Sequence, residues 1–497
     1  MVRHLAGKMP VLSAPVKSAV WFVICSMLQK GIFYLTMPVF TRLLTTEQYG
    51  VYTMYQSWFS IITIVCTLNL SYNVFHRAMV KYADDKDGYT SSMQGLVLVI
   101  TLIVFSTFLF FPEQWESALE LPDELVFCMF LEMLLSPAFF FWATRQRFEY
   151  RYVALVIVSV SITVIGTGLG VAAVILTDGG ALARIYPVVG VDAAVGAFFM
   201  VLQYSRGRKF FSLEYWKFAL AFNLPLMPHY LSTVALNQAD RLMIGRICGF
   251  EDAAVYGVAY SVAMAMTLFV TSVNSSLIPW TYKQLASSDM NASKRIGQVG
   301  TALSAALAAF ALLVVGLGPE LMLFLAPESY REAIWVIPPV GLAVLATMYM
   351  WLFVNVETYY GKNMYVAAVS IGAALLNIVL NAITLPVFGF LAAGWTTLAS
   401  YATMVLGHYA FMRHLQRCNG EASAYRVGQL LIIAAVTCVF SLVFMALYEV
   451  ALARYVLIVV LCIAVFLRRK RLLSIFVEIK GSDKNAENLE DVPKKER

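Results

Sequence analysis

The chain has 497 residues, of which 60% are hydrophobic and 13% are charged, whereas charged residues make up about 25% of an ordinary soluble protein. Together with a mean hydropathy of +0.73, this composition excludes a soluble globular protein and predicts a polytopic membrane protein. The net charge of +6 does not indicate nucleic-acid binding, because the basic residues fall in short loops, where they report orientation. The seven cysteines form no CxxC pair, which argues against a disulfide framework and a metal cluster. We expect no cofactor.

Fourteen apolar segments are long enough to cross a bilayer, which takes about 20 residues each. They predict an all-α fold with about fourteen transmembrane helices. The segments lie at residues 18–41, 49–72, 90–111, 124–144, 152–177, 183–204, 215–237, 253–279, 295–317, 332–356, 364–386, 389–411, 428–448 and 451–467.

The placement of lysine and arginine predicts which ends of these helices face the cytoplasm. Of the 36 basic residues, 29 fall in alternate loops and tails, six fall in the remaining loops, and Lys30 lies within the first segment. Cytoplasmic loops carry the excess of basic residues, and one missed helix would invert every later loop. Both termini are therefore predicted to be cytoplasmic. No loop approaches domain size, so we expect no soluble catalytic domain and no enzymatic activity.

The chain carries signs of an internal duplication. Pro38 and Arg42 near the N-terminus correspond to Pro225, Pro228 and Arg241 further on, and Glu47–Tyr52 aligns with Glu251–Tyr256 at a constant offset. Six helices separate the two segments, which predicts two six-helix bundles related by a pseudo-twofold along the membrane normal, with the substrate path between them. The expected parts are 1–210 and 211–415 for the bundles, 416–470 for helices 13 and 14, and a polar cytoplasmic tail, 471–497.

Two basic residues, one inside the first segment and one just after it, are candidates for contacting an anionic substrate. Lys30 lies about midway through the segment, a position that costs roughly 2.5 to 3.5 kcal/mol for a lysine. It either faces a central cavity, or it snorkels or pairs with an acid elsewhere in the bundle. Arg42 lies nearer the outer edge, where an interfacial arginine is the alternative to a substrate contact.

A second group of candidates lies in the segment that opens the second half. Asp240 and Arg241 are adjacent, so they point about 100° apart on a helix and cannot face each other. They serve either as capping or interfacial groups or as parts of a gate or cavity wall. His229 follows Pro228 in a helix that we expect to bend there. A hydrogen-bonded structural histidine and a proton-linked or ligand-binding histidine both fit it.

Three further acidic residues are candidates for gating or ion coupling. Asp192 and Glu132 lie inside predicted membrane helices, and one of them would neutralise Lys30 if the two were in contact. Glu357 lies at a predicted inner helix end, before Lys362. A solvated loop residue is the expectation there.

The most patterned segment is the hairpin of the eleventh and twelfth helices. It contains Asn377 and Asn381, then Pro386 and Gly389, then the small residues from Gly394 to Ser400. The asparagines share one helix face and can bond a neighbouring helix, while the small residues permit close helix approach. This hairpin, together with PVFTRLLTTEQYGVY and YWKFALAFNLPLMPHYLS…ADRLMIG, resembles the Wzx-type polysaccharide flippases of the multidrug/oligosaccharidyl-lipid/polysaccharide (MOP) exporter superfamily. The resemblance covers about residues 17–415, and it departs from the family at Ala253–Ala254, where a glycine is usual.

The resemblance implies that the chain moves an undecaprenyl-diphosphate-linked oligosaccharide from the cytoplasmic to the periplasmic leaflet of a bacterial inner membrane, for O-antigen, capsule or exopolysaccharide assembly. The implied partners are this lipid-linked glycan and membrane lipid, with a polysaccharide polymerase and a chain-length regulator as further ones. Three alternatives stay open: a lipid II flippase, a multidrug (MATE-type) cation or drug exporter of the same fold, and a membrane glycan polymerase or ligase.

Overall fold

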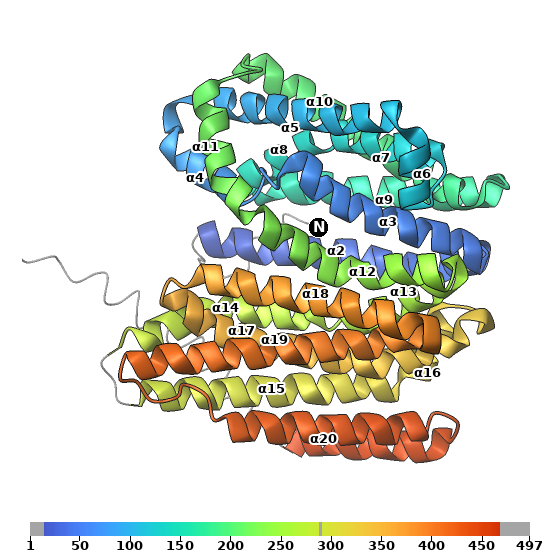
Figure 1. Cartoon of the computed structure of the whole chain (residues 1–497), viewed down its shortest axis with the longest axis vertical. Helices are drawn as coiled ribbons and strands as arrows, with labels where there is room; N and C mark the ends of the chain where they lie inside the picture. Colours follow the sequence, from blue (N-terminus) through green and yellow to red (C-terminus); the bar gives the residue numbers. More distant parts are fainter. Residues whose placement is uncertain (1–13, 288–290, 468–497) are drawn as a thin grey trace, which may run out of the picture. The chain divides into compact units, whose positions relative to one another are not determined.

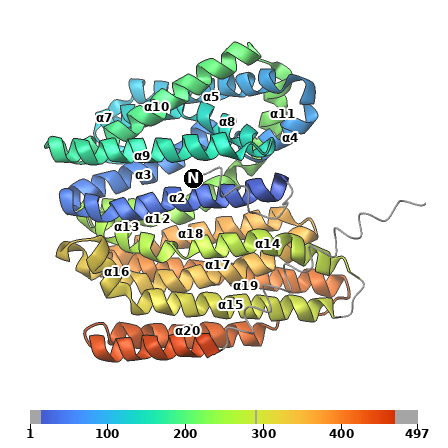
Figure 2. The same ribbon diagram turned by 180° about the vertical axis from the view of Figure 1, so that it is seen from behind.

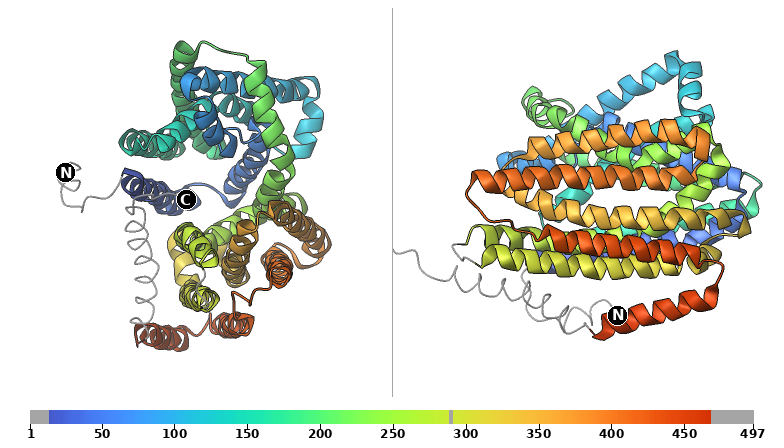
Figure 3. Two further views of the ribbon diagram at one scale, coloured as in Figure 1. Left: turned by 90° about the vertical axis from the view of Figure 1, so that its left-hand side faces the viewer. Right: turned by 60° about the horizontal axis from the view of Figure 1, so that its bottom comes forward.

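The structure is a computed structural model that describes residues 14–287 and 291–467. It is 89% helical, and no strand occurs among these residues. The helices form two compact units, residues 1–254 and 255–497. Within each unit the long helices run side by side, as Figure 1 and the two further views of Figure 3 show. The tail predicted over 471–497 lies outside the described residues.

The first unit combines long helices with shorter connecting ones. Its elements are α2 (Ala14–Leu43), α3 (Thr46–Thr67), α4 (Asn73–Lys81), η1 (Ala83–Asp85), α5 (Lys86–Phe110), α6 (Pro112–Leu119), α7 (Asp123–Leu135), α8 (Pro137–Phe148), α9 (Tyr152–Leu176), α10 (Gly180–Gly207), α11 (Leu213–Asn223), η2 (Leu224–Leu226) and α12 (Met227–Ile247).

The second unit begins within α13, because the division between the units falls after Ala254. Its elements are α13 (Phe250–Met264), α14 (Thr267–Leu285), α15 (Ala292–Gly316), α16 (Gly318–Leu325), η3 (Glu328–Val336), α17 (Ile337–Tyr359), α18 (Asn363–Phe388), α19 (Leu391–Cys418), α20 (Val427–Ala446) and a last apolar helix, Ala451–Leu467.

All fourteen predicted segments coincide with helices of the structure. Ten helical stretches within the described residues are long and apolar enough to cross a membrane. The other four segments lie in 46–67, 213–247, 391–418 and 451–467. The first three carry more polar side chains, and the last is a shorter apolar helix. The fold is therefore that of a multi-pass helical membrane protein, while the total of fourteen spans remains a prediction.

The bend that we predicted at Pro228 lies slightly earlier in the structure, and Pro228 itself lies in the first turn of α12, where a proline is tolerated. The segment that opens the second half is divided into α11 and α12 by one 3₁₀ turn, η2, which contains Pro225. A proline removes one backbone donor and clashes with the preceding turn, so an α-helix cannot continue through it undisturbed. The bend directs α12 along α3, the helix against which it packs most extensively.

Helix α10 is the centre of packing in the first unit. It contacts α9, α7, α5, α8 and α3, and Figure 2 shows it from behind beside α9 and α7. Gly196 allows one close approach, because a Cβ atom added there would lie 2.4 Å from the carbonyl oxygen of Leu135 in α7. Glycine is thus required at this crossing for steric reasons.

Helix α17 has the corresponding role in the second unit, where it packs against α19, α15, α14 and α20. Small residues bring α19 close, and a Cβ atom on Gly394 would lie 2.9 Å from Pro339 Cγ of α17. The predicted interhelical role of the asparagines is confirmed, since the Thr396 hydroxyl of α19 donates to Asn381 Oδ1 of α18. Asn381 Nδ2 in turn donates to Asn377 Oδ1 at 3.3 Å.

The crossing of α10 and α7 gives a test of the packing. Gly196→Ala should destabilise the protein by about 1 to 3 kcal/mol, because the methyl group would push two backbones apart. Gly190 lies in the same helix with nothing within 4 Å of an added Cβ atom, so Gly190→Ala should be neutral or slightly stabilising. Thermal unfolding of the purified variants would measure both effects. Equal stability of the two variants would contradict the close approach.

Candidate functional site

Lys30 lies on α2 with its side chain exposed. It is one helical turn from Tyr34, and residues four positions apart share a helix face. Tyr34 is within electrostatic range of Arg241 on α12, so the face of α2 that carries Lys30 is turned toward the basic residue of α12. Lys30 has no ion pair with an acidic residue in the described part of the chain. The alternative in which Glu132 or Asp192 neutralises Lys30 is therefore not seen among the described residues.

Arg241 is half-buried on α12, and its Nη1 donates to Gln238 Oε1 at 2.9 Å. The neighbouring Asp240 side chain is buried, so the two adjacent charges occupy different environments, as the 100° angle between them requires. Arg241 is also within electrostatic range of Tyr49 on α3. We call Lys30, Tyr34 and Arg241 the basic face of the first unit.

His229 and Arg42 lie away from the basic face. His229 lies twelve residues before Arg241 on α12, and Arg42 lies twelve residues after Lys30 on α2. Each separation corresponds to about 18 Å along the helix axis and to about 120° around it. The His229 ring is half-buried, and its Nδ1 has no hydrogen-bond partner among the described residues. Arg42 is exposed at the end of α2, where its Nη1 donates to the carbonyl of Pro38 at 3.0 Å.

The direction of Arg42 distinguishes it from Lys30. It shares a helix face with Leu35, seven residues earlier, whose side chain is 70% exposed. An apolar side chain exposed to that extent on a membrane helix is typical of a lipid-facing surface. This exposure fits the interfacial alternative for Arg42, which stays a prediction.

Sequence analysis missed a buried arginine in the same unit. The guanidinium of Arg184, near the start of α10, lies over three aromatic rings at centroid distances of 3.4 Å (Tyr52), 4.1 Å (Phe40) and 4.8 Å (Tyr49). Arg184 is only 5% exposed. The aromatic faces stabilise a cation that has lost its water, and the cage ties α10 to α2 and α3. No sequence pattern singled out Arg184, which lies at the start of the predicted segment 183–204.

Two predicted acids, Glu132 and Asp192, lie near each other in the first unit. Glu132 on α7 accepts a hydrogen bond from the Tyr55 hydroxyl of α3 at 3.4 Å. Asp192 on α10 is within electrostatic range of both groups. Both carboxyl groups are half-buried, so two like charges share a confined space. A proton or a cation bound there would relieve their repulsion.

The expectation for Glu357 was wrong. Its side chain is completely buried rather than solvated, and its Oε2 lies 2.9 Å from His408 Nδ1. The last turn of α17 packs against α19 at this point, and that packing covers the carboxylate. His408 supplies the partner that a buried acid requires. No sequence pattern predicted this pair, because the two residues are 51 positions apart.

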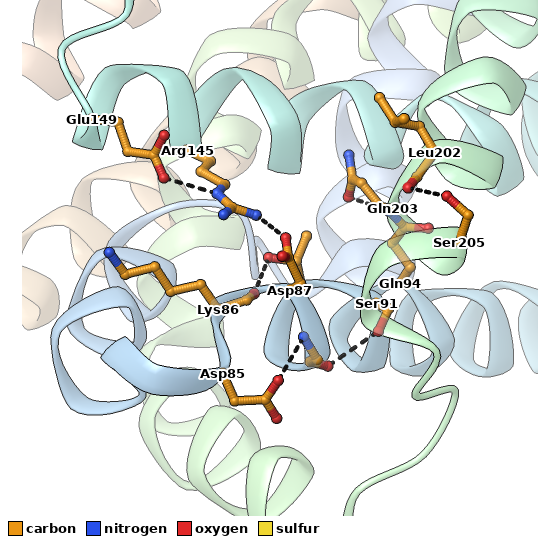
Figure 4. Close-up of polar contacts among 12 residues, drawn as sticks. Asp85, Lys86, Asp87, Ser91, Gln94, Arg145, Glu149, Leu202, Gln203 and Ser205 are labelled. Atoms are coloured by element: carbon orange, nitrogen blue, oxygen red, sulfur yellow. Dashed lines mark hydrogen bonds and ion pairs between the residues drawn. The ribbon is translucent and has the colours of Figure 1, made fainter.

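A cluster of charged residues lies at one end of the first unit. The excess of basic residues in the loops predicts that this end is cytoplasmic. Figure 4 shows the Arg145 guanidinium between Asp87 and Glu149. Its Nε donates to Glu149 Oε1 at 3.0 Å, and Glu149 also pairs with Arg151 at 3.2 Å. The cluster joins the start of α5 to the end of α8.

Asp85 extends this cluster to the segment that connects α10 with α11. It accepts hydrogen bonds from Lys209 Nζ, from the Tyr215 hydroxyl at 2.7 Å and from the backbone N–H of Gly88 at 3.1 Å. The backbone N–H of Lys209 donates to Ser91 Oγ at 3.3 Å. The connecting segment is therefore fixed to α5 by several hydrogen bonds.

Charged groups inside a helical membrane bundle are typical of proteins that move polar substrates or ions across the membrane. The model of the family described as "Polysaccharide biosynthesis protein" matches residues 16–284. The chain belongs to this family, as the sequence resemblance predicted. A protein of Haemophilus influenzae described as "Lsg locus putative protein 1" is 22% identical over 388 residues, covering 73% of this chain and 89% of that protein.

Solved structures share the fold. The lipid II flippase MurJ in an inward closed conformation superposes with a TM-score of 0.62 at 12% identity, over 92% of this chain and 100% of that one. An outward-facing multidrug resistance MATE family transporter of the MOP superfamily superposes with a TM-score of 0.53 at 14% identity, over 82% of this chain and 97% of that one. The fold is that of the MOP superfamily.

The aromatic cage gives a test of the site. Arg184→Ala should lower the stability of the protein by about 2 kcal/mol, since a desolvated cation over aromatic rings contributes about that much. Tyr52→Phe keeps the ring and should have little effect, whereas Tyr52→Leu should destabilise. Arg206 is exposed at the other end of α10, and Arg206→Ala is the control. Thermal unfolding of the four purified variants would refute the cage if Arg184→Ala behaved like Arg206→Ala.

Proposed function

We propose that this protein moves a polyprenyl-diphosphate-linked oligosaccharide from the cytoplasmic to the periplasmic leaflet of the bacterial inner membrane, by alternating access, for surface polysaccharide synthesis. Membership of the polysaccharide biosynthesis family supports a glycan-related substrate. The observation that carries the proposal is the basic face, where an exposed lysine within a membrane helix is turned toward a second basic residue.

The substrate explains why these charges are kept. A diphosphate and a sugar chain cannot cross hydrocarbon unaided, so they need a hydrated path with fixed cations, while the polyprenyl tail stays in the lipid. Lys30 is the first candidate for a phosphate contact and Arg241 the second. The free-energy cost of holding Lys30 in the membrane falls when an anion binds beside it. Arg42, on the lipid-facing side of α2, and His229, about 18 Å from Arg241 along its helix, are placed less directly for this role.

The direction of transport is consistent with the membrane potential. With the cell interior negative, outward movement of one net negative charge is favourable by about 2.3 kcal/mol per 100 mV. The pair Glu132 and Asp192 offers a second source of driving force. If the pair exchanges a proton or a sodium ion during transport, the ion gradient drives the same cycle. Asp240 and the Glu357–His408 pair, both buried, are the remaining candidates for gating.

Two other functions fit the same fold. A lipid II flippase would differ in that its loss is lethal. A drug or cation exporter is favoured by one observation, the acidic pair Glu132 and Asp192 in the first unit, because a cationic substrate requires fixed negative charge along its path. A strain that lacks the gene separates these functions.

Deletion of the gene should leave viable cells that lack surface polysaccharide, since the lipid-linked repeat unit would be made but not moved. Full-length repeat units on their lipid carrier should accumulate on the cytoplasmic leaflet, and extraction of lipid-linked sugars from inverted vesicles would measure them. Loss of viability would favour the lipid II function. Intact polysaccharide together with increased sensitivity to cationic drugs would favour the exporter.

Substitution of Lys30 tests the proposed phosphate contact. Lys30→Ala and Lys30→Glu should reduce surface glycan strongly without lowering the amount of inserted protein, because a lost charge-assisted hydrogen bond weakens substrate binding about 10- to 100-fold. Lys30→Arg keeps the charge and should retain part of the activity. Leu28 is exposed on another face of α2, and Leu28→Ala is the control. Normal surface glycan in both Lys30→Ala and Lys30→Glu would exclude Lys30 as a substrate contact.

A further inference from the structure

A second candidate site lies in the second unit, far along the chain from the basic face. A cavity of about 420 Å³ opens between α16, η3 and the segment that follows α20. It lies at the end of these helices that the basic loops assign to the outside. Its volume falls within the range of about 300 to 1,000 Å³ that small-molecule sites occupy.

The unusual backbone of η3 determines which side chains reach this cavity. The 3₁₀ helix runs for nine residues, although such helices rarely exceed three or four. With three residues per turn, side chains three positions apart line up. Tyr330, Ala333 and Val336 are accordingly all buried, at 1%, 0% and 0% exposure. Glu332 and Trp335, which are also three positions apart, line the cavity, as do Glu328, Tyr330, Arg331 and Ile334 of the other two rows.

Aromatic rings form one wall of the cavity. Trp335 is half-buried, and its ring centroid lies 5.2 Å from that of Tyr448 at an interplanar angle of 44°. The Tyr448 ring is fixed, because its hydroxyl donates to the carbonyl of Val315 at 3.0 Å. The indole N–H of Trp335 donates to no described residue and remains available to a ligand. A buried or half-buried tryptophan usually finds a partner for this group.

Carboxylates form the other wall. Glu328, Glu332 and Glu449 line the cavity together with one cation, Arg331. Glu328 is held by Arg331 at 2.8 Å, whereas Glu332 has no ion pair in the described part of the chain. Three acids against one base give the cavity a negative charge, which repels a phosphate. It is therefore not a second site for the diphosphate.

We infer that this cavity binds a sugar residue of the transported glycan, either uncharged or amino-substituted, on the outer side of the membrane. The apolar face of a sugar ring stacks on an aromatic ring, and its hydroxyl groups donate to carboxylates, which only accept. Trp335 supplies the stacking surface and one donor. Glu332 lies one turn before Trp335, about 6 Å away along η3, and supplies the acceptor. The origin of the sugar rests on the proposed function, but the binding site does not.

Binding can be measured on the purified full-length chain in sugar-free lipid nanodiscs. The probes are oligosaccharides released by mild acid from the host cell's own surface polysaccharide, and saturation-transfer difference NMR reports their contact with the protein. Wild-type protein should bind them, and Trp335→Ala should bind about tenfold more weakly. Glu332→Gln should also weaken binding, while inorganic pyrophosphate should not compete.

A matched control is available in Phe324, which is 63% exposed in α16 and does not line the cavity. Phe324→Ala should bind the oligosaccharides like the wild type. Equal binding by the wild type and Trp335→Ala, or no binding by the wild type, would overturn the inference. Full competition by tetramethylammonium would also overturn it, because it would identify a site for organic cations. So would a photo-crosslinker at position 332 that captures a protein instead of glycan.

The outcome is separable from that of the proposed function. If Lys30→Ala abolishes surface glycan but the wild type binds no oligosaccharide, the transport proposal stands and the sugar site fails. If the oligosaccharides bind through Trp335 but deletion of the gene leaves surface polysaccharide intact, the sugar site stands and the transport proposal fails.

Discussion

A charged side chain inside hydrocarbon is stable only when an opposite charge, an aromatic face or water replaces its lost hydration. The two units of this protein meet that requirement in different ways. Arg184 is enclosed by aromatic rings, and Glu357 is paired with His408. Arg454, which is 2% exposed, is paired with Glu320. Against these compensated charges, Lys30 is notable because it is exposed on a membrane helix and pairs with no acid in the described residues.

The compensated charges have a structural role. A buried pair contributes little net stability, but removing one partner leaves the other uncompensated, so such pairs fix the arrangement of helices. Glu357 and His408 hold α17 to α19 in this way, and the Arg184 cage holds α10 to α2 and α3. An uncompensated cation does not hold helices together in this way. The free-energy cost of its lost hydration remains until a ligand or water contacts it. Lys30, which has no ion pair among the described residues, is the cation for which we proposed such a ligand.

Close packing and irregular backbone determine where the remaining side chains point. Gly196 lets α10 approach α7, and the turn at Pro225 redirects α12 along α3, which brings Arg241 within range of Tyr34 and Tyr49. In the second unit the long 3₁₀ helix turns Trp335 and Glu332 into one cavity. In each case a glycine or a turn that is not α-helical changes how neighbouring helices pack. The side chains that follow then point in directions that a regular helix would not give them.

The membrane class, the helical segments, a proline-induced bend within a few residues of Pro228 and the family were all accessible from the sequence, because they depend on local hydropathy, on proline geometry and on contiguous motifs. The polar contacts were not, because each depends on which helix faces meet. Glu357 was expected in solvent and is buried against a histidine 51 residues away, and no sequence pattern predicted the aromatic cage around Arg184. A single sequence records the period of a helix but not its rotation about its own axis. That rotation, which only tertiary packing fixes, decides whether a charge meets a ring, an acid, lipid or a substrate.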